Sequence, residues 1–186
     1  VLADEIELKA KISSREEIAK RIIAMGGRFL REVAQEDLYF RHPCRDLRER
    51  DEALRLRKEE GRCILTFKGR RLGSGIKMRE EVEVVIDDGG AAATILKRLG
   101  FEEAFVISKN RRIHALEGAE ISLDSVDGLG EFVEIELILK DGVAIEGMRE
   151  RLHGLAERLQ IPKERLTTES YLELLALKSS SSKASK

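Results

Sequence analysis

The sequence predicts an α+β domain in which eight antiparallel strands close into a β-barrel and the helices pack outside it. Three observations lead to this expectation. At least six segments alternate charged and apolar residues with the two-residue period of a β-strand. The charges are grouped by strand, with acids on the first and last strands and bases on the third and fourth. Several helical segments have an apolar face that the apolar strand faces can cover, so the charged strand faces should point inward.

The first half of the chain begins with a strand over residues 3–12, "ADEIELKAKI". Two overlapping capping boxes in "SSREE" then open a helix over 13–25, which the glycine pair in "MGG" ends. An extended stretch follows over 29–40. The segments "EALRLRK" and "CILTFKGR", separated by "EEGR", form a predicted hairpin. After the flexible connection "GRRLGSG", the segment "IKMREEVEVVI" is expected to be the next strand.

The third quarter of the chain begins with a predicted helix over 88–99 that ends at Gly100. Three strands follow over residues 103–116, 120–126 and 131–139. The turns between them are "EGAE" and "DGLG".

The C-terminal part is predicted to be helical. Apolar residues in "DGVAIEGMRERLHGLAERLQ" have the helical period, which predicts a helix over 141–160. A last short helix is expected over 167–178, "TTESYLELLALK". The Ser- and Lys-rich residues 179–186 have the composition of a disordered tail, so we expect residues 1–178 to form one domain.

Composition restricts the classes of function. The formal net charge is −1 although 37% of the residues are charged, so no basic excess indicates nucleic-acid binding. No apolar run is long enough to cross a bilayer and no signal peptide is recognisable, so we expect a cytoplasmic protein, either a monomer or a homodimer. A single Asn, two Gln and no Trp are typical of a thermophile. The segment "GRRLGSGIK" matches neither common glycine-rich phosphate loop.

Opposed acidic and basic faces inside a barrel need a ligand that carries both charges, such as a polyphosphate with a divalent metal. Hard cations such as Mg²⁺ bind carboxylate oxygens together with substrate phosphates. The candidate metal ligands are Glu5, Glu7, Asp124, Glu134 and Glu136. Arginine and lysine bind phosphate oxygens, and the candidates are Lys9, Arg55, Arg57, Lys68, Arg79 and Arg111. An antiparallel sheet with one solvated face would alternate in the same way, and that alternative stays open.

The residues also resemble a known family. "EIELK" matches the ExExK signature of the CYTH superfamily, the triphosphate tunnel metalloenzymes. Its companions follow in the family order: "QEDLYF", "EALRLR", "LTFKG", "REEVE", "ISLDSVDGLGEFVEIE" and "ESYLELL". They extend over residues 3–175, and "DLYF", "DEALRLRK" and "ESYLELL" look most like the class IV adenylate cyclase branch.

The resemblance implies an eight-stranded antiparallel barrel that binds a triphosphate together with Mg²⁺ or Mn²⁺. By motif, the metal-binding acids would be Glu5, Glu7, Glu81, Glu83, Asp124, Glu134 and Glu136. The triphosphate-binding bases would include Lys9, Arg55, Arg57, Lys68 and Arg111, with Lys9 and Lys68 as candidate catalytic residues.

Three functions remain open at this stage. In a class IV adenylate cyclase, the ribose 3′-oxygen of ATP attacks the α-phosphorus and expels pyrophosphate, with Lys9 orienting the α-phosphate. In an inorganic tripolyphosphatase or thiamine triphosphatase, a water attacks a terminal phosphoryl group, activated by Lys68 with Tyr39. A non-catalytic sensor of nucleotides or organic phosphates would use the same residues, because a shared fold does not define the reaction.

Overall fold

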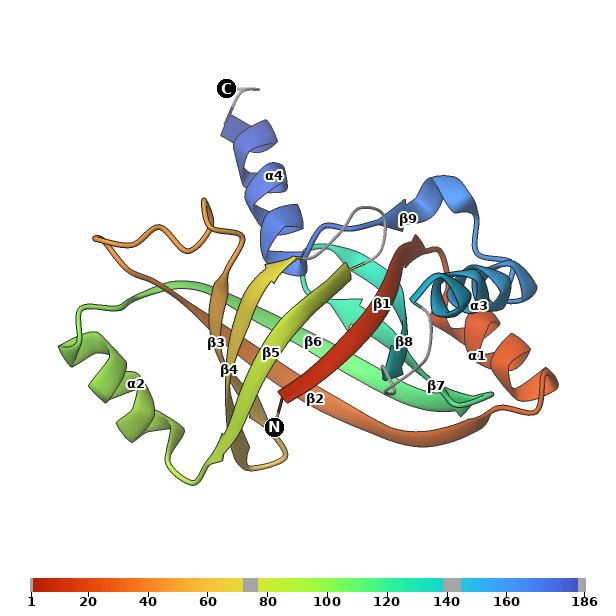
Figure 1. Cartoon of the computed structure of the whole chain (residues 1–186), viewed down its shortest axis with the longest axis horizontal. Coiled ribbons are helices and arrows are strands. Elements are labelled where there is room, and N and C mark those ends of the chain that lie inside the picture. The colour runs from red at the N-terminus through yellow and green to blue at the C-terminus, as the bar shows by residue number, and fades with distance from the viewer. Residues whose placement is uncertain (1, 72–76, 139–144, 184–186) are drawn as a thin grey trace.

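The computed structural model describes residues 2–71, 77–138 and 145–183, and only the backbone of residues 2–5, 77, 78 and 179–183. Its long strands are β1 (Leu2–Ile12), β2 (Arg28–Arg41), β3 (Ala53–Glu59), β4 (Arg62–Arg71), β5 (Lys77–Ile86), β6 (Glu102–Leu116), β7 (Ala119–Val126) and β8 (Gly130–Ile138). The helices are α1 (Arg15–Ala24), α2 (Gly89–Arg98), α3 (Ile145–Arg158) and α4 (Tyr171–Lys183), with the 3₁₀ turn η1 (Lys163–Arg165) and the short strand β9 (Leu166–Thr167) before α4 (Figure 1).

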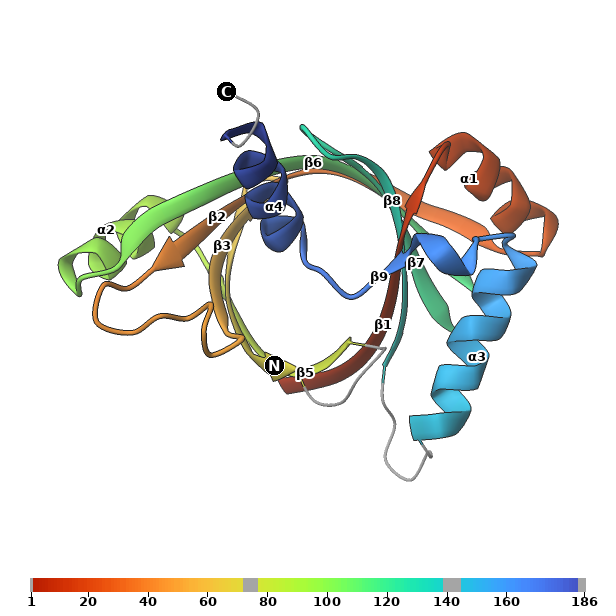
Figure 2. The same ribbon diagram turned by 90° about the horizontal axis from the view of Figure 1, so that it is seen from above.

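The strands form one antiparallel sheet in the order β5-β4-β3-β2-β6-β7-β8-β1-β9. The first strand also pairs with β5, where Leu2 lies opposite Val82 and Glu7 opposite Lys77. Strand-to-strand pairings therefore lead from β5 through the other long strands back to β5, and the sheet curves into the ring seen end-on in Figure 2. The α+β class with a large antiparallel sheet is confirmed.

The helices lie outside this curved sheet. The helix α3 packs against β1 and β8, and α1 packs mainly against β7. In Figure 2, α1 and α3 lie together on one side of the ring, α2 on the opposite side, and α4 at one end. Ser14 caps α1 as expected, because its Oγ accepts a hydrogen bond from the backbone N–H of Glu17 at 3.3 Å. No helix in the described part of the chain has the length and apolar character needed to cross a membrane.

Two boundaries in the C-terminal part differ from the sequence prediction. The helix expected over 167–178 begins only at Tyr171, because Thr167 belongs to β9 and lies opposite Lys9 of β1. Ser170 and Glu173 form the capping box, in which the N–H of Ser170 donates to Glu173 Oε2 at 2.6 Å. The helix continues to Lys183, into the segment expected to be disordered. The predicted end of the 131–139 strand and the predicted start of the 141–160 helix lie within residues 139–144, outside the described residues.

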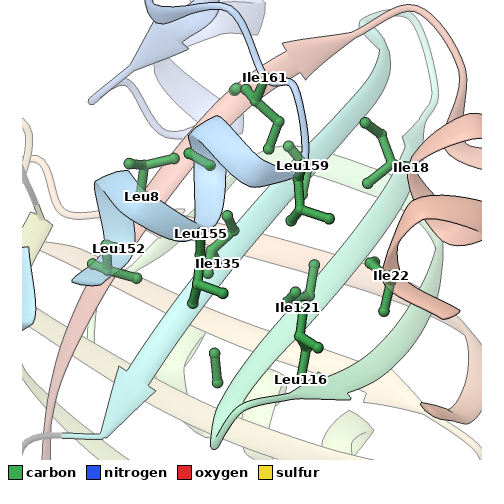
Figure 3. Packing of buried hydrophobic residues seen from close by; sticks show 14 of the residues in the cluster. Leu8, Ile18, Ile22, Leu116, Ile121, Ile135, Leu152, Leu155, Leu159 and Ile161 are labelled. Atoms are coloured by element: carbon green, nitrogen blue, oxygen red, sulfur yellow. The ribbon is translucent and has the colours of Figure 1, made fainter. Parts of the chain in front are cut away.

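The main hydrophobic core lies between the outer face of the sheet and the helices α1 and α3 (Figure 3). Ile6, Leu8, Ala10 and Ile12, the alternate residues of β1, are all buried in it. Their neighbours Glu7 and Lys9 line a cavity on the other face of the strand. The alternation predicted for the first strand is therefore confirmed, with the apolar face outward against the helices and the charged face inward.

Candidate functional site

A cavity of about 410 Å³ lies on the inner face of the curved sheet. This volume suits a small-molecule ligand. The predicted site residues that line it are Glu7, Lys9, Arg55, Arg57, Lys68, Arg79, Glu81, Glu83, Arg111, Glu134 and Glu136. Two predicted residues are not placed there: the side chain of Glu5 lies outside the described residues, and Asp124 lies behind the cavity wall.

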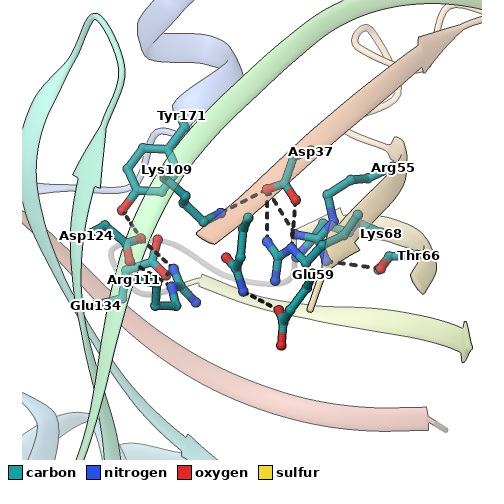
Figure 4. Close-up of polar contacts among 12 residues, drawn as sticks. Asp37, Arg55, Glu59, Thr66, Lys68, Lys109, Arg111, Asp124, Glu134 and Tyr171 are labelled. Atoms are coloured by element: carbon teal, nitrogen blue, oxygen red, sulfur yellow. Dashed lines mark hydrogen bonds and ion pairs between the residues drawn. The ribbon is translucent and has the colours of Figure 1, made fainter. Parts of the chain in front are cut away.

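One group of charges on β1, β6, β7 and β8 consists of Lys9, Arg111, Asp124 and Glu134, the Arg111 cluster. Figure 4 labels its last three members. Arg111 donates to both oxygens of Asp124, at 2.7 and 2.6 Å, and also to Glu134. The other oxygen of Glu134 forms an ion pair with Lys9 Nζ at 2.9 Å. Burial raises the pKa of Glu134, but the charges of Lys9 and Arg111 outweigh it and hold the pKa well below its usual value. The carboxylate is therefore ionised.

Asp124 takes a supporting position rather than one at the cavity surface. It is fully buried, and its Oδ2 also accepts a hydrogen bond from the hydroxyl of Tyr171 at 2.8 Å. The Tyr171 ring lies 4.1 Å from Lys9 Nζ, within the range of a cation–π contact. The first residue of α4 thus contacts both the signature lysine of β1 and the partner of Arg111. The expectation that Asp124 binds a metal therefore stays a prediction, and in this structure Arg111 and Tyr171 donate to its two oxygens.

A second group on β2, β3 and β6 consists of Asp37, Arg55, Arg57 and Lys109, the Asp37 cluster (Figure 4). Asp37 accepts from Arg57 Nε at 2.6 Å, Arg57 Nη2 at 2.9 Å and Lys109 Nζ at 2.8 Å. Arg55 Nη1 is 3.9 Å from the same carboxylate. Burial raises the pKa of Asp37, but the Arg57 hydrogen bond and the Lys109 charge hold it well below its usual value.

The remaining wall, on β4 and β5, pairs its charges across neighbouring strands. Lys68 Nζ lies 2.5 Å from Glu81 Oε1, its direct partner in the strand register. Arg55 Nη2 donates to Thr66 Oγ1 at 3.0 Å and to Glu83 Oε1 at 3.3 Å. Burial and the nearby Arg55 charge lower the pKa of Lys68, while Glu81 opposes that shift. Lys68 is therefore easier to deprotonate than an exposed lysine.

Sequence reasoning missed Lys109 and Asp37, two residues of the Asp37 cluster, and left the face of Tyr39 undecided. Lys109 lines the cavity two positions before Arg111 on β6, so the strand period could have found it. Burial lowers the pKa of Lys109 to about 7, with the Arg57 and Arg111 charges adding to the effect and Asp37 opposing it. Asp37 lies two positions before Tyr39 in "QEDLYF". Tyr39, whose face the sequence left undecided, lines the cavity and is buried beside Ile107.

The open end of the cavity is bordered by α4 and the loop before β3. Arg71 joins them, since its Nη2 lies 2.7 Å from Asp51 Oδ1 and 2.9 Å from Glu173 Oε1. It also donates to the carbonyl of Thr168 at 3.0 Å. Burial raises the pKa of Glu173, but bonds from Ser170 and Arg71 lower it to about 2. This charged contact holds the start of α4 at the end of the cavity.

The acidic residues of the cavity are of the ligand type that hard divalent cations prefer. Glu7 of β1, Glu136 of β8 and Glu120 of β7 occupy directly opposed register positions on three adjacent strands, and all three line the cavity. Like charges directly opposite each other are destabilising, so a cation between them would relieve the repulsion. Glu120 is a further residue that sequence reasoning missed. Among the described residues, no three His, Cys, Asp or Glu side chains already form a metal-binding group.

The balance of charges that line the cavity also indicates a ligand accompanied by cations. Among the described residues that line it, eight are Lys or Arg and nine are Asp or Glu. A polyphosphate alone would therefore enter a site with no excess positive charge. Cations that accompany the phosphates would balance the acids, as hard divalent metals do in many phosphate sites.

Comparison with known proteins places these features in a family. The CYTH domain model matches residues 3–171. A protein of Methanocaldococcus jannaschii with the provisional name of an adenylate cyclase is 39% identical over 173 residues, which is 93% of this chain and 99% of that protein. The adenylate cyclase CyaB of Aeromonas hydrophila is 28% identical, over 91% of this chain and 87% of its own.

A solved structure agrees with the match. A protein of Pyrococcus horikoshii OT3 superposes with a TM-score of 0.85 at 37% identity, covering 94% of this chain and 99% of that one. The family model spans nearly the whole chain, including the strands that carry the cavity. The resemblance of the signature motifs is therefore confirmed, and the chain belongs to the CYTH domain family.

Proposed function

We propose that this protein is a metal-dependent enzyme that acts on triphosphates, and that its reaction is that of a class IV adenylate cyclase. The observation that carries the proposal is the cavity, in which basic and acidic side chains from opposed strands face one another. Membership of the CYTH family, with relatives named as adenylate cyclases, supports an enzymatic role.

The curved sheet would work as a closed barrel, a tunnel around the triphosphate. The pairing of β1 with both β8 and β5 supports this, because it leaves no free edge on either of those two strands along the paired positions. Closure would exclude bulk water and strengthen each charge interaction inside the tunnel.

The basic side chains would hold the phosphates. Arg55 and Arg57 of β3 and Lys109 of β6 lie on either side of β2 and all line the cavity, so three donors can converge on one phosphate chain. Arg111, two positions after Lys109 on β6, and Lys9 of β1 lie on either side of Glu134. A substrate phosphate would compete with Glu134 for these two cations, and Lys9 would then orient the α-phosphate.

Mg²⁺ or Mn²⁺ would be held by Glu7 and Glu136, with Glu5 and Glu134 as further candidates from the motif. When bound, such an ion neutralises phosphate charge and lowers the pKa of the attacking ribose hydroxyl. The 3′-hydroxyl would give its proton to a solvent water as its oxygen attacks the α-phosphorus in line, and the bond to the bridging oxygen would break so that pyrophosphate leaves with that electron pair. Arg55, Arg57 and Arg111 would stabilise the charge on the leaving pyrophosphate.

A product assay tests this proposal. Purified protein is incubated with ATP, tripolyphosphate or thiamine triphosphate, each with Mg²⁺ and with Mn²⁺, and cyclic AMP, pyrophosphate and phosphate are measured. We expect cyclic AMP and pyrophosphate in equal amounts from ATP. Absence of cyclic AMP under every condition would contradict the cyclase assignment.

The second candidate is a triphosphate phosphohydrolase. Lys68 and Tyr39 both line the cavity, and the lowered pKa of Lys68 favours its use as a proton acceptor for an attacking water. Phosphate release from tripolyphosphate or thiamine triphosphate, without cyclic AMP from ATP, would select this reaction. Tight triphosphate binding without turnover would instead identify a non-catalytic phosphate sensor.

A further inference from the structure

We infer that Asp37 is a positioning residue of the triphosphate site, and that its buried carboxylate holds Arg57 and Lys109 where they receive the phosphates. The inference rests on the proposed function, because it concerns how the same cavity binds its substrate. Asp37 is neither one of the proposed metal ligands nor one of the cations proposed to bind the phosphates, Arg55, Arg57 and Lys109, which we call the basic clamp.

The geometry separates Asp37 from the ligand and joins it to the clamp. Asp37 is 1% exposed and does not line the cavity, whereas Arg57 and Lys109 do. Its Oδ1 accepts from Arg57 Nε, and its Oδ2 accepts from Arg57 Nη2 and Lys109 Nζ, all between 2.6 and 2.9 Å. Both of its oxygens are therefore occupied by the cations that face the cavity.

The strand register explains why one carboxylate reaches both cations. Asp37 is directly opposite Arg57 on β3. On its other side, Lys109 of β6 is opposite Gln35 and so lies diagonal to Asp37, within reach of a long side chain. Asp37 thus connects three adjacent strands, β3, β2 and β6, at the height of the cavity.

The charges explain why the carboxylate is needed. Arg55, Arg57 and Lys109 all lie within 4 Å of the Asp37 carboxylate, and without it their positive charges would repel one another more strongly. A bidentate arginine–carboxylate pair also fixes the plane of the guanidinium. The neighbouring Arg57 and Arg111 charges already lower the pKa of Lys109, and Asp37 opposes that shift. Loss of Asp37 would therefore misplace Arg57 and favour loss of the proton from Lys109.

This role and simple electrostatics predict opposite results. If charge alone mattered, replacing Asp37 by a neutral residue would make the site more positive and tighten the binding of a polyanion. If Asp37 positions the clamp, the same replacement weakens binding, because the donors no longer converge. The sign of the effect distinguishes the two explanations.

The test measures binding of inorganic tripolyphosphate with Mg²⁺ by titration calorimetry in wild type, Asp37→Asn, Lys109→Gln and the double variant. Glu59→Gln is the matched control: Glu59 is also buried, pairs with Arg31 and Gln35, and does not line the cavity. We expect Asp37→Asn to raise Kd by roughly 10- to 100-fold with an unchanged stoichiometry. In the Lys109→Gln background, Asp37→Asn should raise Kd by a much smaller factor. The control Glu59→Gln should leave Kd within about threefold of wild type.

Stoichiometry separates positioning from folding, because a partly unfolded variant lowers the number of sites without changing the Kd of the folded fraction. If wild type binds tripolyphosphate and Asp37→Asn binds it equally well or more tightly, the inference about Asp37 is wrong, whereas the proposed function stands. Equal effects of Asp37→Asn with and without Lys109 would overturn the coupling that it requires. No tripolyphosphate binding by wild type would overturn the proposed function and the inference with it.

Discussion

The two sides of the ring are built differently. On the side of β1, β7 and β8, the outer face is buried under α1 and α3, where Ile6, Ile121 and Leu123 have no exposed surface. On the side of β5, the outward residues Val82 and Val84 remain 43% and 54% exposed. A hydrophobic core therefore supports the strands that carry Glu7, Lys9 and Glu134.

The inner face shows the consequence of this difference. The well-supported side carries the Glu7–Glu136–Glu120 row, in which like charges oppose one another and Lys9 Nζ lies 3.5 Å from Glu7 Oε1. The less covered side, over β2 to β5, keeps its cations in place through Asp37, Glu81 and Glu83. Ion pairs therefore organise both walls of the site, and only the wall of β1, β7 and β8 also has a hydrophobic core behind it.

The largest expected effect tests the packing half of this comparison. Leu152 of α3 is fully buried against the sheet, so Leu152→Ala should lower the free energy of unfolding by about 2–5 kcal/mol. The matched change on the other side, Val84→Ala, should cost no more than about 0.5 kcal/mol. Denaturant unfolding of both variants measures the difference, and equal losses would show that the two sides are supported alike.

The next effect concerns the acidic row. Glu7→Gln keeps the shape of the side chain and removes one of the opposed charges, so turnover should fall roughly 100-fold while stability is unchanged or increased. Glu17→Gln on the exposed part of α1 is the control, with turnover expected at the wild-type level. A large drop in the melting temperature of Glu7→Gln would instead assign Glu7 to a structural ion pair with Lys9.

The next prediction concerns Lys109 and the pH dependence of tripolyphosphate binding. Its pKa of about 7 means that the charged form is lost as pH rises through neutrality, whereas a bound phosphate favours that form. Tripolyphosphate affinity should therefore fall about tenfold between about pH 6 and about pH 8 relative to the Lys109→Gln variant, which lacks the titrating group. Parallel pH profiles of the two proteins would contradict this account of Lys109.

The smallest expected effect is at the end of the cavity. Arg71→Ala removes the contacts to Asp51 and Glu173, which are partly exposed, and should cost at most about 1 kcal/mol of global stability. Amides of α4 should exchange with solvent faster, because the start of the helix loses its attachment. Arg41→Ala, which removes the exposed pair with Glu102, is the control and should leave α4 unaffected. Unchanged exchange in Arg71→Ala would show that the packing of Tyr171 and its neighbours on α4 holds the helix without Arg71.

Much of this arrangement could be predicted from the sequence, because strand alternation separates the two faces of each strand directly. The eight long strands, and the inward position of Lys9, Arg55 and Arg111, follow from a period of two. Lys109 was missed because its strand alternates less clearly. The supporting roles of Asp37 and Asp124 could not be predicted, since they depend on which long side chains cover which short ones across neighbouring strands.

The C-terminal part shows a different limit. Helical propensity around "TTESYLELLALK" predicts a helix from residue 167, but pairing with β1 takes Thr167 into β9, a tertiary contact that local sequence does not show. The same pairing brings Tyr171 to the cavity beside Lys9.

The central claim is that the inner face of the sheet binds a triphosphate together with a divalent metal. A crystal structure with tripolyphosphate and Mn²⁺, in which anomalous scattering locates the metal, tests it most directly. The account predicts Mn²⁺ beside Glu7 and Glu136, with the phosphates between it and Arg55, Arg57 and Lys109. Phosphates bound outside the cavity, or Mn²⁺ away from these carboxylates, would contradict it.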